Sequence, residues 1–280
     1  MSENNKSTTA NASAGASTKK PVVNHSSPVK KLLQLSHSLQ FAWFVGHVIT
    51  LVGSIICFAS MGNRFFYRVT WFGVLESFGI ITYQHYYPKA TPNAQNQMTP
   101  QALLQNSDVL YFALALVWFL TPTFTLALVP YATFSLFHVL IYCKSVLMPE
   151  VMNLTAENSK LVSMIANFVR NYNEKCMYWV GTIELGLEAL LALRAMVFYT
   201  RSWIVLLAYS LFIKIRFENS KYMQAAFAQW RVRLDGIMSH PSVPLIFKRG
   251  YGKAKSMLIS VSHFRLSKAQ ATAASSNKTE

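Results

Sequence analysis

Four charged side chains lie within long apolar stretches of the sequence, where charge is unusual and chemistry is possible. These residues are Glu76, Glu184, Glu188 and Arg194. A charge at the centre of a bilayer costs at least about 2.5 to 3.5 kcal/mol, so such residues are candidates for ion pathways, proton relays or catalysis. Pairing between helices, or exposure to a shallow wet cavity, is the simpler explanation. We expect pairing, and we therefore expect function to survive replacement of each glutamate by glutamine.

The other residue types that commonly carry chemistry are scattered along the chain. His47, His85 and His138 are too far apart for the short-spaced histidine clusters of membrane-bound metal oxidases. The chain contains no HExxH, Walker-type glycine loop, GxSxG or CxxC motif. The sequence therefore predicts a protein that is not an enzyme, with no catalytic residue, metal ligand or cofactor. A channel or a lipid-handling membrane enzyme is the third-ranked alternative.

A basic, amphipathic C-terminal region gives the strongest indication of function. Apolar residues recur there at helical spacing beside lysines and arginines, first over residues 227–234 and again over residues 253–265. Basic residues near an anionic leaflet contribute about 1 kcal/mol each, and an apolar helical face can insert among lipid headgroups. The residues expected to bind the membrane are Phe227, Trp230, Arg231, Arg233, Leu234, Lys253, Lys255, Met257, Leu258, Val261, Phe264 and Arg265.

Amphipathic helices of this kind favour curved or loosely packed membranes, so the sequence predicts a curvature-sensing tail that contacts anionic lipids. Two other partners fit the same pattern. The tail could pack against the protein's own transmembrane helices, or its basic residues 248–255 could bind an acidic nuclear transport receptor. Direct nucleic-acid binding is not expected, because Tyr251 is the only aromatic residue interleaved with those basic residues.

The composition indicates that the part of the chain before the C-terminal region lies in a membrane. Hydrophobic residues make up 52% of the 280 residues and charged residues only 13%, about half the share typical of soluble domains. A membrane-spanning helix needs about 20 mostly apolar residues. Four apolar blocks reach that length, at residues 39–61, 65–87, 109–143 and 178–213. The sequence therefore predicts an all-α, multi-pass α-helical integral membrane protein with about four membrane-embedded helical blocks plus interfacial amphipathic helices.

The same patterns divide the chain into four parts. We expect a disordered cytosolic head at residues 1–28 and a membrane domain at residues 29–216. We expect a basic amphipathic cytosolic tail at residues 217–268 and a disordered end at residues 269–280. Within the membrane domain, residues 156–173 predict a separate amphipathic connecting helix.

Two of the four blocks are longer than one crossing requires. Block 109–143 contains Pro122 and Pro130, so it is either one kinked helix or a hairpin. Basic residues flank the cytosolic side of membrane proteins, and both ends of this chain, whose net charge is +15, are basic. We therefore expect both termini in the cytosol and an even number of crossings. That number is four, or six if both long blocks are hairpins.

Two segments resemble a known family, which includes animal transmembrane protein 33 and the fungal pore-membrane proteins of about 33 kDa. The likeness covers roughly residues 30–265 and rests on patterned apolar segments rather than on an active-site motif. The residues that carry it are Pro122, the run Pro130, Tyr131, Ala132, Thr133, Phe134, Ser135, Leu136, Phe137 and His138, then Tyr142, Lys144, Val146 and Leu147, the segment 212–216, and the run His240, Pro241, Ser242, Val243 and Pro244.

The resemblance implies a small multi-span protein of the endoplasmic reticulum membrane and nuclear envelope, including the nuclear pore membrane. It implies no catalytic activity, and it implies association with nucleoporins and with reticulon-type membrane-shaping proteins. From the resemblance we expect that the protein supports the distribution or assembly of nuclear pore complexes. A general reticulum-shaping or adaptor protein without a pore role is the runner-up, because both kinds of paralogue exist in the fungal branch.

Overall fold

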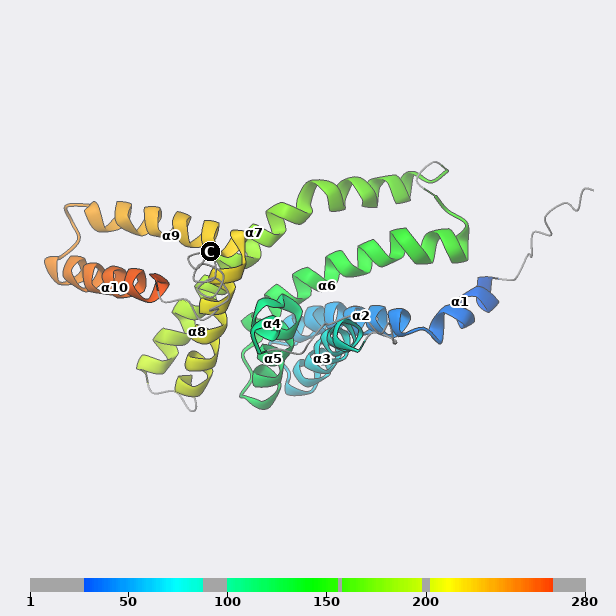
Figure 1. Cartoon of the computed structure of the whole chain (residues 1–280), viewed down its shortest axis with the longest axis horizontal. Coiled ribbons are helices and arrows are strands. Elements are labelled where there is room, and N and C mark those ends of the chain that lie inside the picture. Colours follow the sequence, from blue (N-terminus) through cyan, green and yellow to red (C-terminus); the bar gives the residue numbers. More distant parts are fainter. Residues whose placement is uncertain (1–27, 88–99, 156–157, 198–201, 264–280) are drawn as a thin grey trace, which may run out of the picture.

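The computed structural model describes residues 28–87, 100–155, 158–197 and 202–263 (Figure 1). The segments predicted to be disordered, 1–28 and 269–280, lie outside these residues apart from Pro28. In chain order, the elements are α1 (Pro28–Ser36), α2 (Leu39–Ala59), α3 (Arg64–Tyr86), α4 (Pro100–Gln105), α5 (Ser107–Leu120), the 3-10 helix η1 (Thr125–Ala127), α6 (Leu128–Tyr142), the π-helix η2 (Cys143–Val151), α7 (Lys160–Met196), α8 (Ser202–Asn219), α9 (Lys221–Ser239) and α10 (Leu245–His263).

Every regular element within the described residues is helical, and several can cross a bilayer. Three stretches are long and apolar enough to do so, namely Leu39–Ala59, Thr125–Val151 and Lys160–Met196. The predicted class, an all-α multi-pass membrane protein, is confirmed.

The described helices include three consecutive pairs, each joined by a short connection, which we call hairpins: α2 and α3, α5 and α6, and α7 and α8. The α2–α3 and α5–α6 turns and the C-terminal end of α7 lie close together. Gly62, in the α2–α3 turn, lies against Thr125 just after the α5–α6 turn. From the end of α7, the Arg194 guanidinium lies 4.9 Å from the centroid of the Phe124 ring. All other helix ends of the three hairpins therefore point away from this cluster of turns.

The six hairpin helices form a closed ring. α2 contacts α3 and α6, α3 contacts α5, α5 contacts α8, and α7 contacts both α8 and α6. Aromatic side chains fill the centre, where Trp71, Trp118, Tyr131 and Tyr209 are each no more than 1% exposed. Trp71 meets Tyr131 edge to face, with ring centroids 4.9 Å apart. The ring therefore joins residues that are far apart in the sequence.

Small residues bring α2 and α3 unusually close together. A Cβ atom at Gly73 would lie 2.8 Å from the carbonyl oxygen of Gly46 and 2.8 Å from Ile49 Cγ2. A Cβ atom at Gly53 would lie 2.5 Å from Thr70 Oγ1. Close backbone approach through small residues is a common way to pack helices within a membrane, because lipid offers no hydrophobic driving force between them.

Block 109–143 is a hairpin rather than one kinked helix. Pro122 lies in the turn after α5, and Pro130 lies in the first turn of α6. Proline fits both places, because neither needs an intrahelical hydrogen bond from its nitrogen. α5 has 14 residues and spans about 21 Å, less than the roughly 30 Å of a hydrocarbon core.

The predicted separate connecting helix, 156–173, is not separate in the structure. Residues 156 and 157 lie outside the described residues, and α7 continues without a break from Lys160 to Met196, over 37 residues. The change from polar to apolar composition near residue 176 suggested a boundary. No proline interrupts the segment, however, so its backbone continues as one helix. Block 178–213 is consequently split between the second half of α7 and α8.

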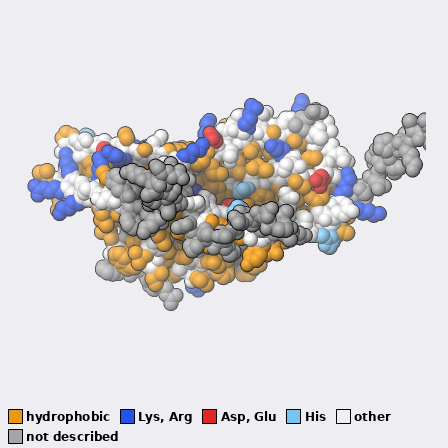
Figure 2. All heavy atoms as spheres, in the orientation of Figure 1, with side chains coloured by type: hydrophobic (Ala, Val, Ile, Leu, Met, Phe, Trp, Pro, Cys, Tyr) orange, Lys and Arg blue, Asp and Glu red, His pale blue; other side chains and the backbone are white. Residues whose placement is uncertain are grey.

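The surface separates apolar from basic side chains. Figure 2 shows hydrophobic side chains gathered over the lower half of this face, where the hairpin turns lie, and Lys and Arg mainly along the upper edge and around α9 and α10. Basic residues gathered along one edge of an apolar surface are expected of a membrane-spanning protein, because Lys and Arg flank the cytosolic ends of its helices.

Candidate functional site

The first half of the C-terminal region is docked on the membrane domain. α9 begins after Ser220, whose side chain accepts a hydrogen bond from the Met223 backbone N–H at 3.4 Å. Met223 and Ala226 are fully buried, and a Cβ atom on Gly181 of α7 would lie 3.5 Å from the Ala226 Cβ atom. The Tyr178 hydroxyl of α7 donates a hydrogen bond to Gln229. Packing on the protein's own helices, one of the alternatives raised by the sequence, therefore describes the start of α9.

The predicted membrane-binding residues of α9 differ in exposure. Phe227 packs against the core and against the Phe217 ring, with centroids 5.0 Å apart. Trp230 and Leu234 are half-buried. The basic residues Arg231 and Arg233 are exposed, and the Arg233 guanidinium lies 5.9 Å from the centroid of the Trp230 ring. The protein itself thus covers much of the apolar stripe expected to enter lipid.

α10 folds back beside α9 (Figure 1) and is held there by one acidic residue. Lys255 Nζ donates to both carboxylate oxygens of Asp235, at 2.7 and 2.8 Å. The Tyr251 hydroxyl donates to the same carboxylate at 2.7 Å, and Arg231 Nε lies 3.9 Å from it. We call this group the Asp235 clamp. Sequence reasoning missed Asp235, and it assigned Lys255 to lipid although the structure pairs it with Asp235.

The clamp gives the contact between α9 and α10 a dependence on pH. The hydrogen bonds from Lys255 and Tyr251 hold the pKa of Asp235 below its ordinary value of 3.8. A lowered pKa means that the folded state favours the carboxylate, so the contribution is present above pH 3.8 and lost as the pH falls through the lowered value. We expect hydrogen exchange of α10, corrected for intrinsic rates, to be constant around neutrality and to rise only in that acid range.

Two substitutions check this expectation at neutral pH. Asp235→Asn should raise α10 exchange to its acid level, because the neutral amide cannot pair with Lys255. Lys253→Gln, which removes an exposed lysine outside the clamp, is the matched control and should leave exchange unchanged. Loss of α10 protection already near neutral pH in the unmodified protein would contradict the role given to Asp235.

α10 exposes more apolar residues than α9, in which Val232 and Ile237 are the exposed large ones. Met257 is 69% exposed, Leu258 59% and Val261 43%. At the other end of the helix, Leu245, Ile246 and Phe247 are all more than 60% exposed. Lys253 is exposed beside them. Two further predicted residues, Phe264 and Arg265, lie outside the described residues. Among the described residues predicted to insert into lipid, the apolar ones left most exposed are therefore those of α10.

A second polar group lies at the centre of the helical ring. Glu184 of α7 is 1% exposed and accepts a hydrogen bond from the Tyr111 hydroxyl of α5 at 2.5 Å. Arg216 Nη2, near the end of α8, donates to its other oxygen at 3.4 Å. The Arg216 guanidinium also lies 5.0 Å from the centroid of the Tyr111 ring. The group therefore joins three helices through one buried ion pair.

The other intramembrane charges identified from the sequence lie apart from this pair. Glu188 accepts a hydrogen bond from Ser210 at 2.5 Å, and Arg194 covers the Phe124 ring. Glu76 is half-buried on α3. The expected pairing is thus found for Glu184 and Glu188. That function survives replacement of each glutamate by glutamine stays a prediction; at Glu184 the change would leave Arg216 buried without a counter-ion, so we expect it to lower stability.

Two histidines that are distant in sequence meet inside the fold. The ring centroids of His47 and His138 are 4.6 Å apart, and His47 Nδ1 lies 3.0 Å from Ser135 Oγ. The edge of Trp43 completes the group. Among the described residues, no three or more His, Cys, Asp or Glu side chains are grouped in a way that would hold a metal ion. The histidine pair is therefore a packed polar contact between α2 and α6.

Comparison with known proteins places these features in a family. Residues 24–263 match the family described as "Transmembrane protein 33/Nucleoporin POM33". The chain is 47% identical to the "Pore membrane protein of 33 kDa" of Saccharomyces cerevisiae, over 85% of this chain and 89% of that protein. It is 30% identical to the "Nucleoporin POM33" of Chaetomium thermophilum, over 77% of this chain and 83% of that one.

A third relative carries a broader name. The "Pore and endoplasmic reticulum protein of 33 kDa" of Saccharomyces cerevisiae is 28% identical, over 73% of this chain and 84% of that protein. No solved structure matches the chain.

Proposed function

The chain belongs to the transmembrane protein 33/nucleoporin POM33 family, and from that membership we propose that it is a non-enzymatic protein of the nuclear pore membrane that supports the distribution or assembly of nuclear pore complexes. The observation that carries this proposal is the 47% identity, over most of both chains, to a relative named as a pore membrane protein. Nucleoporins and reticulon-type membrane-shaping proteins are the proposed protein partners. The nuclear envelope and the endoplasmic reticulum are the proposed locations.

Removal of the protein from cells tests this role. Nucleoporin foci should become clustered or fewer on the nuclear surface, while the peripheral reticulum keeps its shape. The relative named for both the pore and the endoplasmic reticulum motivates the runner-up, a general shaping or adaptor role in the reticulum. An altered reticulum with normally spaced pores would select that alternative instead.

Within the C-terminal region, α10 is the element proposed to contact curved membrane. Its apolar residues are uncovered, and Lys253 supplies positive charge for an anionic leaflet. α9 connects α10 to the membrane domain, because the buried residues of α9 pack against α7 and the Asp235 clamp binds α10 to α9. Curved leaflets expose more hydrocarbon between headgroups, so an apolar helix such as α10 binds them better than flat ones. The sequence predicted membrane binding by the whole tail, and we now propose it for the second half of the tail, α10.

The three hairpins support a topology in which both termini are cytosolic. If each of the six hairpin helices crosses the bilayer, the start of α2 and the end of α8 lie on the same side of it, because six is an even number. Lys31 near the N-terminal end donates to Asn153, in the connection between η2 and α7, at 3.1 Å. That connection must then lie on the same side of the membrane as the termini.

The sequon Asn153-Leu154-Thr155 gives a direct check of this topology. We expect it to remain unglycosylated in cells, because glycosylation occurs in the lumen and the connection is cytosolic. Treatment with a glycosidase should not change the mobility of the protein, and protease added to intact microsomes should remove tags from both termini. A glycan on Asn153 would place the connection in the lumen and contradict the three-hairpin topology.

A further inference from the structure

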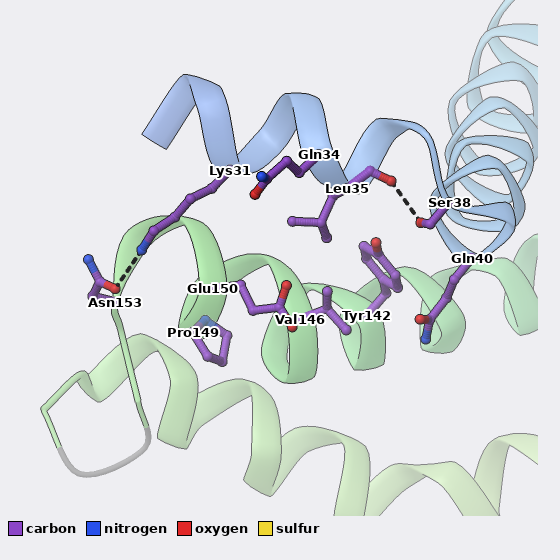
Figure 3. A pocket seen from close by; sticks show the side chains of 10 residues that line it. All are labelled: Lys31, Gln34, Leu35, Ser38, Gln40, Tyr142, Val146, Pro149, Glu150 and Asn153. Atoms are coloured by element: carbon purple, nitrogen blue, oxygen red, sulfur yellow. Dashed lines mark hydrogen bonds between the residues drawn. The ribbon is translucent and has the colours of Figure 1, made fainter. Parts of the chain in front are cut away.

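A polar groove lies between α1 and the end of the second hairpin (Figure 3). Its volume is about 620 Å³. Lys31 and Gln34 of α1 line one wall, and Tyr142 and Glu150, at the end of α6 and in η2, line the other. The groove adjoins the start of α2, the first helix long and apolar enough to cross a membrane. It therefore lies at the level where lipid headgroups meet the protein.

The two walls carry opposite charges. On one side, Lys31 Nζ reaches across to Asn153 Oδ1 at 3.1 Å and keeps donors to spare, since an ammonium group has three. On the other side, Glu150 is exposed and makes no hydrogen bond or ion pair with any described residue. A ligand that carries an anion and a cation a short distance apart would complement both walls.

A buried hydroxyl adds a third point of recognition. Tyr142 is 2% exposed, and its hydroxyl has no hydrogen-bond partner among the described residues. Figure 3 shows this hydroxyl directed toward α1 across the groove. An unpartnered buried hydroxyl is destabilising, and a ligand oxygen or nitrogen that reached it would remove that penalty. The face of the Tyr142 ring is already stacked on Phe44, with centroids 4.4 Å apart.

We propose that this groove binds the headgroup of phosphatidylethanolamine. The phosphate accepts hydrogen bonds from the Lys31 ammonium and the Gln34 amide, and the Tyr142 hydroxyl donates one more when α1 shifts to admit it. The ligand's primary ammonium donates to the Glu150 carboxylate. Each contact is a charge-assisted hydrogen bond or completes an unsatisfied group.

The same geometry disfavours phosphatidylcholine. Its trimethylated ammonium has no N–H to donate to Glu150, and such cations are bound instead by the faces of aromatic rings. Phe44 stacks on the Tyr142 ring, and Tyr142 is only 2% exposed, so the ring offers no open face for that role. A lipid is the expected source of the phosphoethanolamine group because the groove adjoins the start of α2, the first helix long and apolar enough to cross a membrane. The inference holds whether or not the protein acts at nuclear pores.

Native mass spectrometry of the purified full chain in detergent micelles tests the proposal. With dioleoylphosphatidylethanolamine and dioleoylphosphatidylcholine added in equal amounts, we expect the ethanolamine lipid to be retained about tenfold more. Glu150→Gln should abolish this preference, and Lys31→Gln should reduce retention of both lipids. Lys31→Arg keeps the cation and should retain binding. Lys30→Gln, at an exposed neighbouring position outside the groove lining, is the matched control and should bind normally.

Three results would overturn the proposal. Equal retention of the two lipids would exclude recognition of the ammonium group. Preserved selectivity in Glu150→Gln would place the binding site elsewhere. Competition by soluble glycerophosphoethanolamine at concentrations equal to the lipid would show that the ligand is a free small molecule rather than a membrane lipid.

Discussion

Replacing Arg216 by methionine is expected to lower the free energy of unfolding by about 3 to 5 kcal/mol, because it leaves Glu184 buried without its counter-ion. Glu184 is 1% exposed and its only cationic partner among the described residues is Arg216. Glu184→Gln should destabilise in the same way by leaving the guanidinium unpaired. The measurement is thermal or denaturant unfolding of the full chain in detergent micelles.

A double substitution separates the ion pair from general damage to the core. Glu184→Gln combined with Arg216→Met removes both charges, so it should recover a large part of the stability lost in either single variant. Glu188→Gln is the matched control, because its carboxylate is bonded to the neutral Ser210 hydroxyl and no buried cation is left behind. Additive losses in the double variant would show that the two side chains act independently.

The second large effect is expected at Gly73, where α2 and α3 come closest. Gly73→Ala should cost about 1 to 3 kcal/mol through overpacking, since the new Cβ would lie 2.8 Å from the Gly46 backbone oxygen. A flexible side chain could move aside, but a backbone carbonyl within a helix cannot. Gly73→Leu should prevent the hairpin from closing and leave little folded protein after purification. Unfolding in micelles and the yield of monodisperse protein are the measurements.

A glycine with free space around it provides the comparison. Apart from the neighbouring residues and backbone of α7 itself, no atom lies within 4 Å of a Cβ added to Gly186. Gly186→Ala should therefore be neutral or stabilise by up to about 1 kcal/mol through helix propensity. If Gly73→Ala were as stable as Gly186→Ala, the α2–α3 contact would be looser than the structure has it.

The apolar runs 39–61 and 65–87 correspond to α2 and α3, and capping residues that the sequence analysis did not use mark the starts of both helices. α2 follows Ser38, which caps it by accepting from the Phe41 N–H at 3.1 Å. α3 follows Asn63, which accepts from the Phe65 N–H at 2.9 Å. Capping residues next to an apolar run act over a few residues, so they can be read directly from the chain. The predicted blocks and these helices agree to within a few residues.

The contacts between helices that are far apart in the sequence could not be predicted from local signals. Glu184 and Arg216 are 32 residues apart, and His47 and Ser135 are 88 apart. They meet only because the helical ring closes, and no local pattern encodes that closure. Asp235 was missed for a related reason. In the sequence, a lone acidic residue in a basic helix is indistinguishable from a solvent-exposed one. In the structure, the turn at 240–244 brings Lys255 into contact with it.

We propose that the protein resides at the nuclear pore membrane and that α10 keeps it on the curved membrane there. Fluorescence imaging of the tagged full chain beside a tagged nucleoporin tests this most directly. The double substitution Met257→Asp with Leu258→Asp adds two charges to the exposed apolar face of α10. Ser256→Asp with Ser260→Asp adds the same charge at exposed polar positions of that helix and is the matched control.

We predict that the unmodified chain and the serine control form puncta that coincide with the nucleoporin. The Met257 and Leu258 variant should stay in the membrane but spread evenly over the nuclear envelope and reticulum, because its anchoring and ring helices are intact. An even distribution of the unmodified chain would contradict the pore assignment. Puncta of equal intensity in all three proteins would contradict the role of α10.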